Sequence, residues 1–397
     1  MLREKLFVVL LTSTVLVVSN LWLGGYLFSY QSVGSEIAAP ADALYEWNLN
    51  QRAPFEYRML FPALVNGLWR MTAQTNAAFY GSYVGVSFAC GIGAALAFFQ
   101  LLLSVGFSAR RSLMGAGVFL LLPPFLLAYT LPVHTREDTL AYLLLCVGLL
   151  LLVRKQYAGF ALVSVAGAAC RETLLILPFV LLFFTNDLSF LKRALLASLP
   201  VVAWVLIRVL IDTDHESYDP LDGLEWNLNN PAQVVGFAFI TFGPLWIGWI
   251  KGRSIPRPSA LADGIELLTR SAPWVLLLIL LSTFLGGVYN EIRLLYLGFP
   301  WVIVLSLLFF STYAPQIKTI VRTTRYIKYV GSLGIASGLV YYVLAKNFAS
   351  VVGPIYYDVP VQTWLAVFSV MFFVSLAMLP LYWLVGKHRP LTPPRYD

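Results

Sequence analysis

Charged side chains are scarce in this sequence. Only 12% of its 397 residues are Asp, Glu, Lys or Arg, and 59% are hydrophobic. An ordinary soluble domain has about 25% charged and about 45–50% apolar residues. Because the apolar runs recur along the whole chain, one buried core cannot hold them. The composition excludes a soluble globular enzyme, a disordered protein and a fibrous repeat, and it predicts a polytopic membrane protein.

Cysteine and several catalytic motifs are also scarce or missing. The three cysteines, Cys90, Cys146 and Cys170, lie inside apolar runs, so no disulfide framework is expected. The chain contains no G-x-S-x-G, H-E-x-x-H or Walker motif. Serine hydrolases, zinc hydrolases and ATP-driven pumps therefore receive no support.

Twelve apolar stretches are candidate membrane spans, since about 20 apolar residues cross a bilayer. We expect an all-α bundle of about 12 spans (range 10–13) in one integral membrane domain over residues 1–397. The first stretch exceeds the roughly 7–15 apolar residues of a signal peptide, so it is kept as a helix. The stretches are 6–28, 80–103, 113–130, 140–153, 157–170, 173–185, 194–211, 233–250, 271–288, 294–312, 329–345 and 362–385.

Basic residues indicate the orientation of these spans. With the N-terminus in the cytoplasm, 19 of the 27 Lys and Arg residues but only 5 of the 20 acids fall on inner segments. Every even-numbered connection then carries Lys or Arg, as the positive-inside rule requires. Both termini are expected in the cytoplasm, at the inner (plasma) membrane of a bacterium. Topology and anionic lipid explain the net charge of +7, so no nucleic-acid partner is expected.

Small residues are predicted to bring helices together at one place. The row Gly81, Gly85, Ala89, Gly93 and Ala97 repeats every four residues. Such a row places small side chains on one helix face, where a neighbouring helix can approach closely.

The first outer loop, 29–79, is rich in polar residues and includes a stretch that resembles an interfacial helix. A carboxylate at the membrane surface can act as a general base toward a hydroxyl group. Two arginines can clamp a phosphate or diphosphate. The alternative is a solvated loop with arginines reaching toward lipid headgroups. The candidate residues of this loop are Asp42, Glu46, Arg52 and Arg58.

Charged residues also interrupt the apolar runs farther along the chain. Arg171 and Glu172 lie at membrane depth, where charges usually face a cavity, a partner or the bundle interior; the alternative is an ion pair that lets two short helices meet. Arg293, beside Glu291 in a short outer turn, can meet a lipid phosphate or anchor to headgroups.

The second outer connection has two interpretations. It contains His134, Arg136, Glu137 and Asp138. Acids in the first turn of a helix suit its dipole, which makes them capping residues. They can equally serve as a metal ligand or contact a substrate hydroxyl. The acidic outer loop at 212–232 offers carboxylates to Mg²⁺ or Mn²⁺, although a solvated loop is the favoured interpretation.

This arrangement resembles the GT-C glycosyltransferases, which use polyprenyl-phosphate-linked sugars on the outer face of a membrane. The resemblance rests on the long first outer loop, on a proline-then-tyrosine-arginine segment, and on charged residues around the short helices and the late outer turn. The segment reads Pro54-Phe55-Glu56-Tyr57-Arg58, followed by Leu60-Phe61-Pro62-Ala63-Leu64.

The resemblance implies a function for these residues. By position, Asp42 is the best match to the family's catalytic carboxylate, and Glu46 is the next. An inverting transfer would move a sugar to a glycan, lipid or protein acceptor, while Arg58, Arg171 and Arg293 neutralise the leaving phosphate. The other outer charged residues would line the same substrate site. No cofactor is certain, and a requirement for Mg²⁺ or Mn²⁺ stays open.

Other classes remain in competition. A secondary transporter also has many spans, but it should show broken helices in matching halves with charge near the midplane. The sequence shows one clear interruption, at 170–172. A polymerase or ligase of lipid-linked glycans is closer in function to the transferase than a transporter is, and the sequence hardly separates the two. A structural membrane scaffold predicts that neutralising Arg171 changes only stability.

Overall fold

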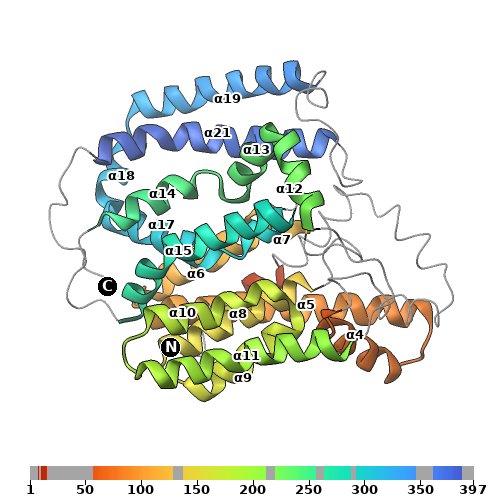
Figure 1. Ribbon diagram of the computed structural model, residues 1–397. Coiled ribbons are helices and arrows are strands. Elements are labelled where there is room, and N and C mark those ends of the chain that lie inside the picture. Colours follow the sequence, from red (N-terminus) through yellow and green to blue (C-terminus); the bar gives the residue numbers. More distant parts are fainter. Residues whose placement is uncertain are drawn as a thin grey trace.

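The computed structural model is entirely helical in the residues that it describes (Figure 1). Those residues form 18 helices, one of which is a 3-10 helix. The predicted all-α class is therefore confirmed for this part of the chain. The described residues are 8, 10–15, 57–127, 137–211, 220–255, 263–287, 292–345 and 361–386.

The helix boundaries follow the apolar stretches closely. All predicted spans from 80–103 onward overlap described helices, whereas most of 6–28 lies outside the described residues. The helices are α4 (Leu60–Arg70), α5 (Asn76–Ser104), α6 (Ala109–Leu121), α7 (Pro123–Leu127), α8 (Asp138–Val153), α9 (Tyr157–Cys170), η2 (Glu172–Leu175), α10 (Ile176–Phe184), α11 (Phe190–Leu210), α12 (Pro220–Asn229), α13 (Pro231–Phe242), α14 (Leu245–Arg253), α15 (Asp263–Gly286), α16 (Ile292–Tyr296), α17 (Phe299–Thr312), α18 (Ala314–Val321), α19 (Thr324–Ala345) and α21 (Val361–Gly386).

Three helices are long and apolar enough to cross a membrane on their own. They are α5, α11 and α15. Two bent pairs, α13 with α14 and α17 with α18, raise the number to five if each pair is one span. Helices α8, α9 and α10 are apolar but shorter, as expected for helices that meet at a polar pair. The described helices thus give three to five candidate spans, and the count of twelve stays a prediction.

The predicted single span at 233–250 is wrong in one respect, because it is two helices bent by 75°. Helix α13 ends at Phe242 and α14 begins at Leu245. Between them, Gly243 has a φ of +50°, a left-handed conformation that glycine adopts at little cost. Pro244 has no N–H with which to continue the helical ladder. This dipeptide explains why the helix breaks here.

The helices lie side by side in layers (Figure 1). In this view α19 and α21 pair at the top, and α9 and α11 lie at the bottom. Helix α8 has 16 residues and is therefore about 24 Å long. Asp138 begins it and Lys155 follows its end. Residues predicted on the outer side and residues predicted on the inner side thus lie at opposite ends of the same helices.

A cluster of buried aromatic rings lies between these ends, about one helical turn from Asp138. The ring of Phe119 lies 5.9 Å from that of Tyr296 and 4.5 Å from that of Phe299, and Tyr142 lies 5.3 Å from Tyr296. The Tyr296 hydroxyl donates a hydrogen bond to the Phe119 carbonyl. Since Tyr142 follows Asp138 by one turn and Tyr296 belongs to the same short helix as Arg293, this packing fixes two charged helix ends.

The predicted row of small residues meets a neighbouring helix over part of its length, since α5 packs along α8, and a still closer approach occurs elsewhere. In the row on α5, Gly93 contacts Leu143, but no described atom lies within 4 Å of a Cβ added at Gly81 or Gly85. The close approach is between α14 and α17. A Cβ at Gly252 would lie 2.1 Å from the backbone oxygen of Leu305, and one at Gly248 would lie 2.7 Å from Oγ of Ser306.

We predict that Gly252→Ala destabilises the protein. The added methyl group meets backbone on α17, which cannot move aside alone, and overpacking of this kind costs about 1–3 kcal/mol. Gly117→Ala on α6 is the matched control, because its Cβ meets nothing within 4 Å among the described residues and alanine favours helix. Thermal unfolding of the purified full chain in detergent should rank Gly117→Ala at or above the parent and Gly252→Ala below it. Equal midpoints for both variants would contradict the close packing.

Candidate functional site

Six charged side chains meet at one end of the bundle, and we refer to them as the charge cluster. One lies two residues before α4, and the others lie at the start of α8, at the junction of α9 and η2, and in the short helix α16. All six were predicted as site residues, although they are spread over more than half of the chain. The cluster consists of Arg58, Glu137, Asp138, Arg171, Glu172 and Arg293.

Arg58 joins the two glutamates of the cluster. Its Nη1 lies 2.5 Å from Oε1 of Glu137, and its Nε lies 3.1 Å from Oε2 of Glu172. Its Nη2 also donates to Oε1 of Glu172, so the guanidinium holds that carboxylate with two parallel hydrogen bonds. Paired contacts of this type fix orientation as well as charge.

Asp138 joins the other two arginines. Its Oδ1 accepts a hydrogen bond from Nη1 of Arg171, and its Oδ2 lies 3.4 Å from Nη1 of Arg293. Asp138 and Arg171 are 0% exposed, and Arg293 is 2% exposed. Burying a charge is costly unless it is paired, so these contacts are needed to hold three helix ends together.

Backbone geometry explains why Arg171 and Glu172 reach the cluster. Arg171 is extended, with φ of −163°, and its N–H donates to the Gly167 carbonyl, which ends α9. The Cys170 thiol lies 3.8 Å from the Glu137 carbonyl oxygen, to which it donates. The junction is therefore attached to the start of α8 by main chain as well as by side chains.

The helix-capping interpretation of Glu137 receives no support from hydrogen bonding. Glu137 is the N-cap residue of α8, but its side chain makes no hydrogen bond to the N–H groups of the first turn. Asp138 is in the first turn, as predicted, and its carboxylate accepts from arginines. Both acids are fully buried, so their main contacts are with the charge cluster.

Arg171 carries two buried nitrogen atoms that have no acceptor among the described residues. Its Nη1 contacts the carboxylates, whereas Nε and Nη2 have no hydrogen-bond partner within the described part of the chain. The Nε–Nη2 edge is the edge that binds a phosphate or carboxylate through two parallel hydrogen bonds. Because an unmade buried hydrogen bond is expensive, this edge is suited to an oxyanion.

The remaining predicted site residues cannot be placed beside the cluster. Asp42, Glu46, Arg52, His134, Arg136 and Glu291 lie outside the described residues. Within the described residues, no group of three or more His, Cys, Asp or Glu side chains could hold a metal ion.

The predicted acidic loop at 212–232 is partly helical. Its residues 220–229 form α12, which packs on the end of α15. There the Asn227 amide donates to the carbonyls of Phe284 and Gly287, at 3.0 and 2.8 Å. The acids at 212–219 lie outside the described residues.

Arg208 is a fourth arginine near the cluster, and the sequence analysis missed it. It is in the last turn of α11, with its guanidinium carbon 4.6 Å from the ring centre of Tyr57 and 4.0 Å from that of Trp204. It interacts electrostatically with Glu172 and Arg58. A basic residue inside the apolar stretch 194–211 was the signal that could have revealed it.

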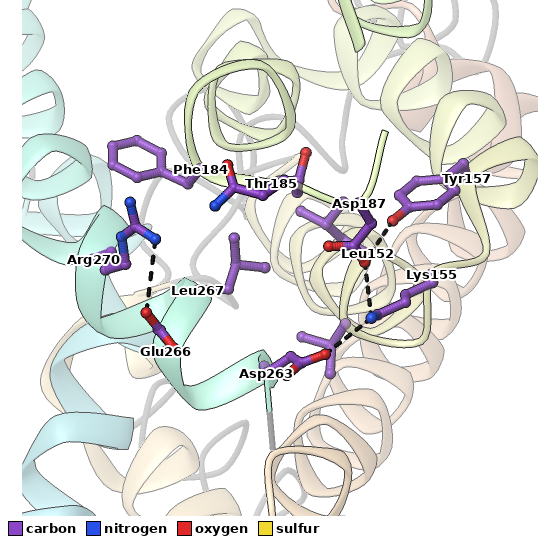
Figure 2. A pocket seen from close by; sticks show the side chains of 13 residues that line it. Leu152, Lys155, Tyr157, Phe184, Thr185, Asp187, Asp263, Glu266, Leu267 and Arg270 are labelled. Carbon is purple, nitrogen blue, oxygen red and sulfur yellow. Dashed lines mark hydrogen bonds and ion pairs between the residues drawn. The ribbon is translucent and has the colours of Figure 1, made fainter. Parts of the chain in front are cut away.

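A pocket of about 230 Å³ lies at the opposite end of the bundle (Figure 2). Lys155 Nζ bridges two carboxylates there, at 2.9 Å from Asp187 and 2.9 Å from Asp263. The Tyr157 hydroxyl donates to Asp187 at 3.1 Å. These groups satisfy one another's charge, so this pocket is the weaker candidate for a binding site.

The backbone at Lys155 indicates a structural role for that bridge. Its φ is +58°, and it occupies the position after a helix end where glycine is usual. The N–H groups of Lys155 and Gln156 donate to the carbonyls of Leu152 and Leu151, at 3.0 and 2.8 Å. A lysine is strained in this conformation. Its ammonium group, however, joins the end of α8 to Asp187 and Asp263, which glycine could not do.

The sequence matches no protein-family model, and no curated protein matches it.

We predict that Asp138→Asn is much more destabilising than Glu172→Gln. The first change leaves two buried guanidinium groups without their shared carboxylate, which costs about 3–5 kcal/mol. The Glu172 side chain is 28% exposed, so water can replace part of its contact. Denaturant unfolding of both purified variants checks the order. Similar midpoints would show that Asp138 is not the central partner.

For the opposite end, we predict that Lys155→Gly is more stable than Lys155→Ala. Both variants lose the bridge, but glycine adopts a positive φ freely and alanine does not. Thermal unfolding of the two variants measures the difference directly, and an alanine variant as stable as the glycine variant would contradict the strain.

The same bridge makes stability depend on pH. The hydrogen bond from Lys155 lowers the pKa of the Asp187 carboxyl below its ordinary value of 3.8. The stabilisation is present above that ordinary value and is lost as the pH falls through the lower folded pKa. The stability gap between the parent and Asp187→Asn should therefore close in strong acid. A gap that stays constant would exclude this linkage.

Proposed function

We propose that this chain is an integral membrane glycosyltransferase of the GT-C type. It would move a sugar, with inversion, from a polyprenyl-phosphate donor to an acceptor on the extracytoplasmic face. One observation carries the proposal: three arginines from distant segments meet at one end of an apolar bundle, and Arg171 among them has a buried edge without an acceptor in the described residues.

The apolar surface supports a membrane location, and the proposal retains the expected count of about twelve spans. Helix α11 is apolar, and only 11% of its most apolar 18 consecutive residues are buried inside the protein. Its exposed residues include Leu195, Leu199, Val202 and Leu206. A contiguous apolar face of this length is unfavourable in water and suits lipid. The shorter helices cross as part of the same bundle.

The charge cluster supports a phosphate-bearing substrate. In the transfer, the bond between the anomeric carbon and the phosphate oxygen breaks, and the polyprenyl phosphate leaves with the bonding electrons. Arginines fixed in a water-poor site stabilise that developing charge more strongly than arginines in water. The acids of the cluster hold Arg58, Arg171 and Arg293 in place before the substrate arrives.

A carboxylate of the first outer loop would complete the reaction. Asp42 takes the proton of the acceptor hydroxyl as its oxygen bonds to the anomeric carbon, and Glu46 is the second candidate for this role. The proton thus moves to the carboxylate, the sugar moves to the acceptor, and the donor becomes polyprenyl phosphate. The configuration at the anomeric carbon inverts because the attack occurs opposite the leaving group.

A secondary transporter is the second candidate, and the break at Gly243-Pro244 is the feature that favours it. Residues 231–250 contain no charged side chain, however. The charge cluster lies at the end of the bundle, whereas an alternating-access site lies near its middle. Polymerases and ligases of lipid-linked glycans share the chemistry of the proposed site, and the acceptor separates them from simple transferases.

We predict that Asp42→Asn lowers sugar transfer by about 10²–10⁴-fold, because the general base is lost. Membranes containing the full chain are incubated with a panel of labelled polyprenyl-phosphate hexoses, and transfer of label to the endogenous acceptor is measured. Asp263→Asn is the matched control, since it removes a carboxylate at the opposite end of the bundle. Undiminished transfer by Asp42→Asn eliminates Asp42 as the base and moves the role to Glu46.

The same assay separates the classes. Arg171→Gln should abolish the transfer measured per folded molecule, because the leaving phosphate loses its partner, whatever the loss of stability. A scaffold would lose only stability, and a transporter would show substrate uptake into vesicles without formation of a glycosidic bond. Absence of transfer from every donor by the parent protein would reject the transferase.

A further inference from the structure

Arg208 is held flat by two aromatic side chains at the margin of the charge cluster. Its guanidinium carbon lies 4.0 Å from the ring centre of Trp204, one turn earlier on α11, and 4.6 Å from that of Tyr57. Tyr57 directly precedes Arg58, so the stack connects α11 to the cluster. Stacking of this kind leaves the N–H groups in the plane of the guanidinium free to bind an acceptor.

The charge of Arg208 is not neutralised within the described residues. The three other arginines of this end each pair with a carboxylate, and the cluster has equal numbers of arginines and acids. The single hydrogen bond of Arg208 in the described part is a long one, of 3.5 Å, to the carbonyl oxygen of Trp204. Among the described residues, its half-buried guanidinium therefore adds one positive charge that no carboxylate at this end pairs with.

A second donor lies at the same place. The indole Nε1 of Trp204 is buried and has no acceptor within the described residues. A buried N–H without an acceptor is costly. Two adjacent groups that donate and cannot accept, one of them cationic, favour an anionic ligand with more than one oxygen.

We propose that Arg208, with Trp204, is a binding site for the phosphate oxygens of a lipid phosphate ester. The site rests on the proposed function for its connection with catalysis, but binding can be measured without it. Arg208 is in the last turn of an apolar helix whose outward face suits lipid, so a phosphate attached to a lipid tail reaches it from the side. A helix-end arginine that served only the helix dipole would need no contact with Tyr57 of another segment.

The test uses the purified full chain in nanodiscs of phosphatidylcholine, with farnesyl phosphate as the probe. Arg208→Gln should bind farnesyl phosphate about tenfold more weakly than the parent, as expected for loss of a charge-assisted contact. Arg208→Lys keeps the charge but loses the planar fork, so its affinity should be intermediate. The matched control is Arg253→Gln, which removes an arginine stacked on Trp249 at the far end of α14, at 5.4 Å, and it should bind within twofold of the parent.

A second arm identifies the source of the phosphate. The amount of phosphatidylglycerol that copurifies with each variant is measured after expression in membranes containing that lipid. Loss of bound phosphatidylglycerol in Arg208→Gln but not in Arg253→Gln, with unchanged farnesyl phosphate binding, assigns the site to a bilayer phospholipid. Loss of farnesyl phosphate affinity assigns it to the prenyl phosphate. Either result supports the site.

Parental behaviour of a folded Arg208→Gln variant in both arms overturns the proposal, with the thermal unfolding midpoint as the test of folding. If Arg208→Lys binds as weakly as Arg208→Gln, the planar fork rather than charge alone makes the contact, and the site is supported. Failure of the proposed function is distinguishable, because a parent protein that binds no farnesyl phosphate can still retain phosphatidylglycerol through Arg208.

Discussion

One buried carboxylate, which contacts a different arginine with each of its two oxygens, determines how the end of the bundle that holds the charge cluster is built. Asp138 accepts from Arg171, which follows the end of α9, and from Arg293 in the short helix α16. Burying a guanidinium away from water without a paired anion would cost more free energy than the fold can supply. The start of α8, the break after α9 and the short helix α16 must therefore meet, and the aromatic packing of Tyr142 and Tyr296 gives their contact a fixed geometry.

The helices and most of the charge cluster could be predicted from the sequence, because in so apolar a chain both the apolar runs and the charged residues that interrupt them are easy to recognise. Long apolar runs located the helices, and charges inside or beside those runs located Arg58, Glu137, Asp138, Arg171, Glu172 and Arg293. The same logic applied to Arg208, which was overlooked because it lies inside a run that otherwise appears uninterrupted. Which acid pairs with which arginine depends on tertiary contacts, and no local pattern encodes those.

Helix packing was harder to predict than helix location. A row of small residues permits close approach, but it does not specify where along the row the partner lies: on α5, Gly93 meets Leu143 of α8, whereas Gly81 and Gly85 have no described atom that close. The pair Gly248 and Gly252 has the same spacing and does receive a neighbour, the backbone of α17. The dipeptide Gly243-Pro244 is a signal for a helix break. It was not used as one because the residues on both sides are apolar and together resemble a single span.

The aromatic centre has a consequence for the molecule as a barrier. Phe98, Phe119, Tyr142, Tyr296 and Phe299 are all at most 1% exposed, and they lie between the charge cluster and the bridge at Lys155. These five side chains carry only two hydroxyl groups, so the layer offers few partners to a polar or charged group. A layer of low polarity thus separates the charged groups at the two ends of the bundle.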